Sequence, residues 1–417
     1  MPRFVSVPAD PGLLRLPWHL PLERWPQEHT VALPRGISRH VVRFIRWGGH
    51  IYAVKEAEER YVLRESRLLR DLERLDVPAV EPVGVVLDRA TADGEPLQPI
   101  LLTRHLSFSL PYRAVFSRAA RPDTVVRLVD ALAALLVRLH LAGFFWGDCS
   151  LSNTLFRRDA GAFAAYLVDA ETGELHDELS PGQRAHDLEL AHTNIFGELL
   201  DLQAGGFLSD DIELLELADT VVKRYESLWE ELTAPEEFDT DELYRLEHRI
   251  QRLNALGFDV AELDIHTDID GRHIRIQPKV VDAGHHSRRL LRLTGLDVEE
   301  NQARRLLNDL DVFRAATDQQ NEDEEIVAHQ WLTEVFEPVV RMVPDELRGR
   351  LEPAEIFHEV LEHRWYLSER AGREVPLVDA ARAYLTDVLP NRPDERERLP
   401  TADDLSALSE RTGSGVQ

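Results

Sequence analysis

The sequence predicts an α+β protein in which a small antiparallel sheet precedes two mainly helical regions. Short runs of β-branched and aromatic residues fill the part from Arg35 to about residue 106, interrupted by one stretch of helical spacing. After Arg121-Pro122 the apolar residues follow helical spacing over most of the chain. With 417 residues, the chain is longer than one compact core usually holds, so we expect more than one domain.

The first region predicts the order strand, strand, helix, strand, strand. His40–Trp47 and His50–Lys55 are the first two strands, and the intervening Gly48-Gly49 is typical of a tight hairpin. Before them, residues 1–30 are Pro-rich and predicted to be irregular, with Trp18 and Trp25 anchoring them to a domain. The other elements expected here are a helix over 57–75 and strands near 83–87 and 100–103.

The second region begins with Thr124–Leu141, which is so largely apolar that a buried helix is expected. A polar loop follows, and it leads into a strand at Thr154–Phe156. The remaining elements expected here are a strand at Ala165–Val168 and helices around 184–203 and 211–233.

The third region is predicted to be mainly helical, with one β-hairpin formed by Ala261–His266 and His273–Gln277. Asp297 with Glu300 forms a capping-box pattern that predicts a helix from Val298 to Asp309. Further helices are expected at 323–342, 353–370 and 377–388. The predicted divisions are 1–106, 107–235, 236–390 and a disordered tail over 391–417.

Composition narrows the classes of function. The formal net charge of −27 argues against general binding of nucleic acids or anionic lipid surfaces. Cys149 is the only cysteine, which excludes an intramolecular disulfide and a thiolate zinc site. We find no uncharged apolar run of membrane-spanning length and no signal-peptide pattern, and therefore expect a cytoplasmic protein without a membrane span. The sequence does not indicate the oligomeric state.

The most informative segment is Trp146–Asn153, which places Asp148 five residues before Asn153 in the loop between an apolar helix and a strand. Asp169 ends the next predicted strand. Upstream, Lys55 ends a strand and is one of three lysines in a chain whose other cations are arginines. A carboxylate that orients a hydroxyl, oxygen ligands for a metal ion and a compact ammonium are what phosphoryl transfer requires.

Residues from about 30 to 205 resemble protein-kinase-like phosphotransferases, close to the Kdo/WaaP lipopolysaccharide kinases and the aminoglycoside-phosphotransferase-like enzymes. The resemblance implies a bilobal protein-kinase-like fold. It implies that Lys55 contacts the nucleotide phosphates, that Glu65 pairs with Lys55, and that Asp148 is the catalytic base. Asn153 and Asp169 become the magnesium ligands. Glu58, Glu59 and Glu73 remain alternatives to Glu65.

The rest of the resemblance concerns the nucleotide and the support of the loop. It implies adenine contacts from Thr103, Arg104, His105 and Leu106, and a phosphate-covering loop with Gly36 and Ser38. That loop has one glycine instead of the three of Gly-x-Gly-x-x-Gly. Asp187 becomes a structural brace of the catalytic loop, and His140 a structural hydrogen-bonding residue. Glu171 is either a further metal ligand or a solvated carboxylate.

We therefore predict an ATP- and Mg²⁺-dependent phosphotransferase that acts on a hydroxyl group. A nucleotide-binding pseudokinase with a regulatory C-terminal region is the alternative, favoured by the single-glycine loop, by Trp146 and by Ala170-Glu171. A purely structural helical adaptor is the third possibility. The acceptor stays open between a sugar, a small metabolite and a protein side chain.

The C-terminal half has two further features. Residues 266–292 are locally basic, which predicts either an anionic ligand or neutralisation of acidic neighbours. The order of the regions also resembles an uncharacterised bacterial family in which a kinase-like half precedes a helical domain, and this resemblance implies no substrate.

Overall fold

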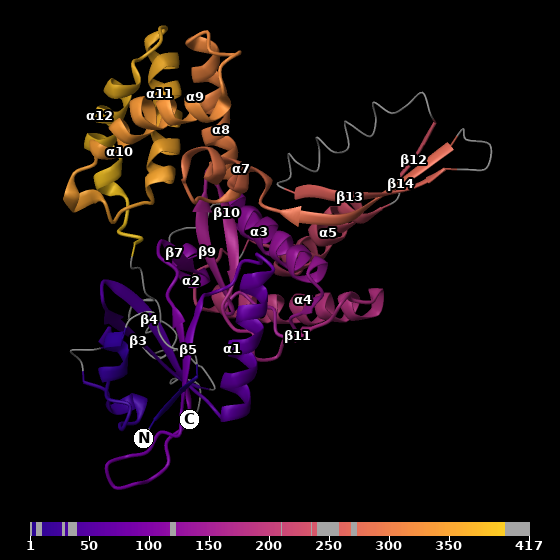
Figure 1. Ribbon diagram of the computed structural model, residues 1–417, viewed down its shortest axis with the longest axis vertical. Helices are drawn as coiled ribbons and strands as arrows, with labels where there is room; N and C mark the ends of the chain where they lie inside the picture. Colours follow the sequence, from indigo (N-terminus) through magenta and orange to yellow (C-terminus); the bar gives the residue numbers. More distant parts are fainter. Residues whose placement is uncertain are drawn as a thin grey trace. The chain divides into compact units, whose positions relative to one another are not determined.

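The computed structural model describes residues 2–5, 11–26, 30–31, 40–116, 122–209, 211–234, 236–239, 258–267 and 273–396. The chain divides into two compact units, which are described separately below (Figure 1). Unit 1 comprises Met1–Phe156, Ala165–Val222 and Glu397–Gln417, and unit 2 comprises Arg157–Ala164 and Lys223–Arg396.

Unit 1 begins with a six-stranded antiparallel sheet whose strand order is β1-β5-β6-β4-β3-β2. The predicted hairpin is confirmed: Gly48 and Gly49 both have positive φ angles, of 57° and 81°, which glycine adopts without strain. The strands are β1 (Arg3–Val5), β2 (Thr30–Val31), β3 (Val41–Trp47), β4 (His50–Glu56), β5 (Pro82–Leu87) and β6 (Ile100–Arg104).

The two faces of this sheet have different neighbours. Tyr52 and Val54 of β4 lie in a core with Trp18 and Trp25, so the predicted anchoring of the N-terminal segment is confirmed. The prediction that residues 1–30 lack regular structure is wrong in part, since β1 pairs with β5 and two short 3₁₀ helices, η1 (Pro11–Arg15) and η2 (Leu22–Arg24), follow. Helix α1 (Glu59–Arg74) packs on β5 and β6 through its apolar stripe. Because side chains alternate along a strand, Lys55 points away from that Trp-containing core.

The helical part of unit 1 is organised around α3 (Pro122–Leu141) and α4 (Pro181–Ala204). Leu132, Leu135 and Leu136 of α3 are at most 2% exposed, which confirms the predicted buried helix. Sequence spacing missed the short elements here, because two to five residues contain too little of any period. The remaining elements are α2 (Tyr112–Phe116), α5 (Leu214–Thr233), β7 (Ser109–Pro111), β8 (Phe144–Phe145), β9 (Thr154–Asp159), β10 (Ala162–Leu167) and β11 (Glu174–Leu175).

Unit 2 is a helical bundle with a three-stranded sheet of order β12-β14-β13. The predicted hairpin is confirmed and is longer than expected, whereas the residues between its two strands, 268–272, lie outside the described residues. Trp331, Phe357 and Tyr384 are central to the core. The elements are β12 (Glu236–Asp239), β13 (Phe258–Thr267), β14 (His273–Ala283), α7 (His285–Thr294), α8 (Glu300–Ala316), α9 (Glu324–Trp331), η3 (Leu332–Phe336), α10 (Glu337–Arg341), η4 (Asp345–Leu347), α11 (Pro353–Ala371), α12 (Leu377–Asp387) and η5 (Leu389–Asn391).

Two predictions in unit 2 need correction. The capping box at the start of α8 is formed by Glu299 and Gln302 and not by Asp297 and Glu300, because the carboxylate of Glu300 accepts hydrogen bonds from the backbone of α7 instead. The disordered tail was predicted from residue 391, but residues 391–396 are ordered. There the carboxylate of Glu395 accepts from Arg158 at 2.9 and 3.0 Å. Residues 397–417 lie outside the described part.

The turn between β9 and β10 belongs to unit 2. The carboxylate of Asp159 accepts hydrogen bonds from the backbone N–H groups of Asn301 and Gln302, at 3.1 and 2.7 Å, in the first turn of α8. Arg158 and Glu395 form the ion pair described above. The tip of the β9–β10 hairpin is therefore held by contacts within unit 2.

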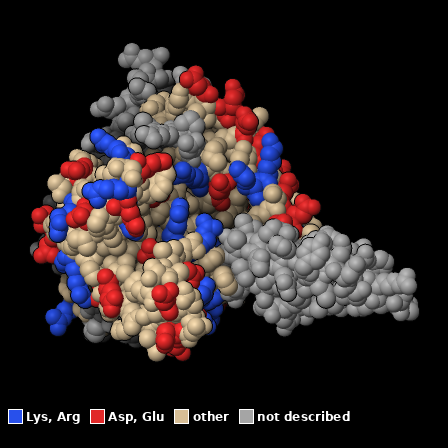
Figure 2. All heavy atoms as spheres, turned by 90° about the horizontal axis from the view of Figure 1, so that it is seen from above, with Lys and Arg blue, Asp and Glu red and all other residues tan. Residues whose placement is uncertain are grey.

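Charges of both signs are interspersed over the face drawn in Figure 2. Within the basic segment 266–292, His286 contacts the carboxylate of Glu300 at 2.5 Å and Arg289 pairs with Glu324. For these two residues the neutralising interpretation is the better one, and an anionic ligand for the segment stays a prediction. Among the described helices, none is both long and apolar enough to cross a membrane.

Candidate active site

A cavity of about 920 Å³ in unit 1 brings together residues from distant parts of the sequence. Its wall is formed by the sheet, by α1, by the loop before β9, by the segment after β10 and by α4. Of the predicted site residues, it contains Lys55, Glu65, Thr103, Asp148, Asn153 and Asp169, and it also contains His40, Glu171, Asn194 and Glu198.

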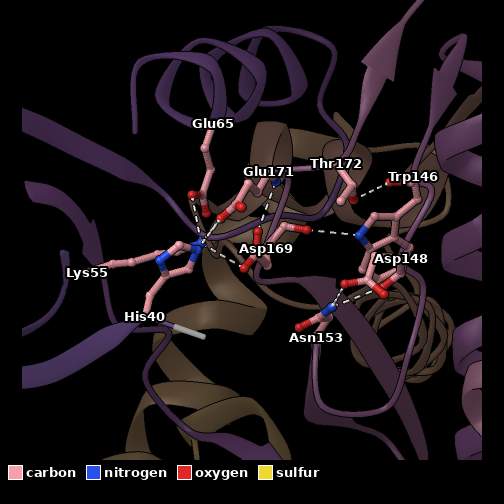
Figure 3. Close-up of polar contacts among 9 residues, drawn as sticks. All are labelled: His40, Lys55, Glu65, Trp146, Asp148, Asn153, Asp169, Glu171 and Thr172. Carbon is pink, nitrogen blue, oxygen red and sulfur yellow. Dashed lines mark hydrogen bonds and ion pairs between the residues drawn. The ribbon is translucent and has the colours of Figure 1, made fainter. Parts of the chain in front are cut away.

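Lys55 is the centre of one half of this cavity (Figure 3). Its Nζ lies 3.1 Å from Oε2 of Glu65, 2.8 Å from Oδ2 of Asp169 and 2.8 Å from Oε2 of Glu171. The structure thereby selects Glu65 from the glutamates of α1. Glu65 lies on the same side of the helix as the buried leucines, and its side chain is only 3% exposed.

One ammonium facing three carboxylates leaves a surplus of negative charge. Burial disfavours the charged form of Lys55, but the attraction of Glu65 and Asp169 outweighs it and raises the pKa of the ammonium above its ordinary value. Burial together with the charge of Asp169 raises the pKa of Glu65 to about 8. The cluster is therefore one in which Lys55 is charged, while a further cation would stabilise full ionisation of the carboxylates.

The same carboxylates fit a divalent cation by their chemistry. Glu65, Asp169 and Glu171 each offer an oxygen, and these atoms all lie within 4.8 Å of one another. Carboxylate and amide oxygens are the ligands that Mg²⁺ and Ca²⁺ prefer. The backbone N–H of Glu171 donates to Oδ1 of Asp169 at 2.9 Å, which fixes the orientation of that carboxylate.

The other half of the cavity is formed by the loop from Trp146 to Asn153. The amide nitrogen of Asn153 donates to the backbone carbonyl of Asp148 at 3.0 Å and to its Oδ2 at 3.1 Å (Figure 3). The backbone carbonyl of Asn153 accepts from Val168 N–H at 3.0 Å, one residue before Asp169. The start of β9 and the end of β10 thus place the two predicted metal ligands on neighbouring backbone segments.

Asp187 supports the loop from Trp146 to Asn153 through hydrogen bonds. Its carboxylate accepts from the backbone N–H groups of Trp146 and Gly147, at 2.7 and 2.8 Å, and contacts Nε2 of His140 at 3.0 Å. Gly147 has φ of +75°, a conformation in which other residues are strained, so a glycine before Asp148 is a conformational requirement.

Comparison with known proteins agrees with this geometry. The lipopolysaccharide kinase (Kdo/WaaP) family matches residues 46–200. Residues 46–200 are a kinase-like domain of the Kdo/WaaP type. The predicted fold class is confirmed with it: an antiparallel sheet comes first and a helical part follows.

Other comparisons extend beyond the kinase-like domain. A domain of unknown function, DUF4032, matches residues 227–389. Among solved structures, the chain is similar to "WaaP in complex with acyl carrier protein", with 17% identity, a TM-score of 0.37, and coverage of 61% of this chain and 99% of that one. No curated protein matches.

In the kinase-like domain, Trp146 stands two residues before Asp148 and is fully buried. Its indole Nε1 donates to the backbone carbonyl of Asp169 at 2.9 Å, and its carbonyl accepts from the hydroxyl of Thr172 at 2.9 Å. Trp146 therefore connects the Asp148 loop to the Asp169 segment, which explains how a tryptophan fits here.

The residues predicted to contact the nucleotide in the kinase-like domain differ in where they lie. Thr103 lines the cavity. The backbone N–H groups of Arg104 and His105 donate to the carbonyls of Glu81 and Ile51, at 2.8 and 2.9 Å. Adenine recognition by Thr103–Leu106 stays a prediction, and Gly36 and Ser38 lie outside the described residues.

Sequence reasoning missed His40, Asn194 and Glu198. Nε2 of His40 lies 2.9 Å from Oε2 of Glu171, so this histidine adds to the Lys55 cluster. Asn194 and Glu198, both in α4, contact the loop from Trp146 to Asn153. A signal for them did exist: they follow Asp187 by seven and eleven residues, which places all three on one helix face.

Proposed function

We propose that the kinase-like domain transfers the γ-phosphate of ATP to a hydroxyl group in a Mg²⁺-dependent reaction. The observation that carries this proposal is the convergence of Lys55, Asp148, Asn153 and Asp169 on one cavity from three separate segments. Phosphoryl transfer needs little covalent chemistry from the protein, so the placement of charges is what matters. A cytoplasmic location belongs to the same proposal.

The residues divide the work as follows. Lys55, kept charged by its carboxylate neighbours, binds phosphate oxygens and offsets their charge. Asp148 accepts the hydrogen bond of the acceptor hydroxyl and orients it for attack. Asp169, Glu171 and the side-chain oxygen of Asn153 would hold Mg²⁺, which supplies positive charge to the phosphate oxygens. The oxygen of Asn153 is the ligand atom because its amide nitrogen donates to Asp148.

Uncharged polar residues of the cavity support a proposal for the acceptor. Ser152 and Thr193 line the cavity with hydroxyl groups, and Gly197 lines it with backbone. Such groups form hydrogen bonds to a polyhydroxylated molecule without requiring it to carry charge. We propose a hydroxylated small molecule as acceptor, with a protein side chain as the alternative.

The test is single-turnover incubation with γ-labelled Mg·ATP, with water as the default acceptor, together with thermal denaturation. We expect label release by the wild type, loss of release in Asp148→Asn, and nucleotide-dependent stabilisation in both. Asp177→Asn, the same change at an exposed position of unit 1, is the control and keeps full turnover.

The alternatives give different results. Stabilisation by Mg·ATP without any label transfer, to water or to the protein itself, identifies a pseudokinase. The absence of any stabilisation identifies a structural adaptor. Unchanged turnover in Asp148→Asn rejects the proposed role of that residue.

A further inference from the structure

We propose that Asn194 of α4 positions the carboxylate of Asp148 for phosphoryl transfer. This inference rests on the function proposed above and assigns a positioning residue to it. Nδ2 of Asn194 donates to Oδ1 of Asp148 at 3.2 Å and to the backbone carbonyl of Cys149 at 3.2 Å. Both partners are acceptors, so the amide nitrogen of Asn194 must face them.

The Asp148 carboxylate is consequently held from two directions. Asn153 donates to Oδ2 at 3.1 Å and Asn194 donates to Oδ1 at 3.2 Å. Two donors on different oxygens fix the plane of the carboxylate, and hence the direction in which its lone pairs meet an acceptor hydroxyl. A carboxylate bonded at one oxygen alone can still rotate about its χ2 axis.

Asn194 is the middle member of a polar row on one face of α4. Asp187 precedes it by seven residues, and Glu198 follows it by four. At the two ends, Asp187 accepts from the backbone of Trp146 and Gly147, and Glu198 accepts from that of Leu151 and Ser152. The row follows the catalytic loop from its start to its end.

The three members differ in what they hold. In the contacts above, Asp187 and Glu198 bind backbone groups and so shape the loop, whereas Asn194 also binds the side chain that faces the acceptor. A neutral amide suits this position, since it donates to a carboxylate without adding charge to a cavity that already contains six carboxylates. An aspartate there would remove the donor and place a like charge beside Asp148.

Steady-state turnover of Mg·ATP by Asn194→Asp and Asn194→Ala tests the inference. We expect kcat to fall about tenfold or more in both, because near-attack geometry is lost, with KM for Mg·ATP within about twofold of wild type. A merely structural defect of the cavity would change KM together with kcat.

Gln203→Glu is the matched control. Gln203 lies on the same helix, and its amide donates to the carbonyls of Ser209 and Ile212, so the chemical change is identical but distant from Asp148. Its kcat and KM should equal those of the wild type. Wild-type kcat in Asn194→Asp and Asn194→Ala would overturn the inference.

A double-mutant cycle keeps the test independent of the proposed function. The unfolding midpoints in urea of Asp148→Ala, Asn194→Ala and the double variant are expected to be non-additive, as for side chains in contact. Additive midpoints reject the contact even when the wild type turns over ATP. Failure of the wild type to turn over ATP rejects the proposed function and leaves the cycle to decide on the contact.

Discussion

The Lys55 cluster of unit 1 and two ion pairs of unit 2 treat buried carboxylates in opposite ways. In the cluster a single ammonium, that of Lys55, serves the carboxylates of Glu65, Asp169 and Glu171. In the two pairs each carboxylate has its own arginine: Glu395 accepts from two nitrogens of Arg158, and Glu359 accepts from Arg392. Both units belong to a chain with the same acidic composition, so composition does not explain the contrast.

The Lys55 cluster and the arginine–carboxylate pairs differ in net charge. A guanidinium that binds a carboxylate through two nitrogens satisfies its charge and its geometry together, which is typical of a structural ion pair. The Lys55 cluster carries a negative surplus and opens onto a cavity, which suits the binding of a cation and of phosphate. The contrast therefore separates the proposed active-site cluster of unit 1 from two structural ion pairs of unit 2.

The largest effect is expected where the surplus charge is altered. Asp169→Asn removes the charge of a predicted metal ligand while keeping its shape, and ATP turnover should fall about 10³-fold. Single-turnover label release measures this. Asp177→Asn, at an exposed position, should leave the rate unchanged. A loss below tenfold in Asp169→Asn would contradict the assignment of Asp169.

The next largest effect is expected on stability in unit 2. Glu395 is 1% exposed, so Glu395→Ala leaves the partly buried Arg158 without its bidentate partner, which costs about 3–5 kcal/mol of unfolding free energy. Urea denaturation measures it. Asp379→Ala removes the exposed pair with Arg382 and should cost less than about 1 kcal/mol. Equal costs for the two variants would reject the contrast drawn here.

A smaller, pH-dependent effect is expected from Asp159. Burial and the charge of Glu299 raise the pKa of Asp159 to about 7, against the hydrogen bonds from Gln302 and Asn301. The folded state therefore binds the proton more tightly than the unfolded state, so stability falls as pH rises from about 4 to about 7, by about 2–4 kcal/mol.

The variant Asp159→Asn cannot ionise and should show a flatter stability profile over this pH range, at a lower stability overall. Urea midpoints at pH 5 and pH 8 provide the comparison. Parallel profiles for wild type and variant would show that Asp159 does not carry the pH dependence.

The smallest effect is expected for Glu171. The sequence leaves open whether this residue is a metal ligand or a solvated carboxylate. If it helps to hold the cation, Glu171→Gln weakens Mg²⁺-dependent binding of ATP about tenfold, or about 1.4 kcal/mol. Isothermal titration at several Mg²⁺ concentrations measures it. Glu174→Gln, at a largely exposed carboxylate nearby, is the control. Identical affinities in the two variants would make Glu171 a partner of Lys55 and nothing more.

Much of the fold was predictable from the sequence, since strands such as β3 and β4 and helices such as α3 and α11 have long, regular apolar periods. The errors fall where the period is too short or a tertiary contact intervenes. β1 was missed because three residues carry no pattern, although pairing with β5 orders them. The capping residue of α8 was misassigned because Glu300 is bound by α7.

The site shows the same division. Lys55, Asp148, Asn153 and Asp169 could be proposed from the sequence, because their spacing and their places at strand ends match the pattern of the kinase-like family. His40 has no local signature, and Asn194 is marked only by its helical spacing from Asp187. Their roles arise from the packing of α4 under the loop and of β3 beside Glu171.

The sequence by itself determined the order of elements and the residue types available for phosphoryl transfer, because periodicity and turn chemistry act over a few residues. The tertiary structure alone decided which carboxylates share Lys55 and which have an arginine of their own. Electrostatic balance depends on distances between residues more than a hundred positions apart, as between Lys55 and Asp169. Folding, not composition, therefore placed the negative surplus in one cavity of unit 1.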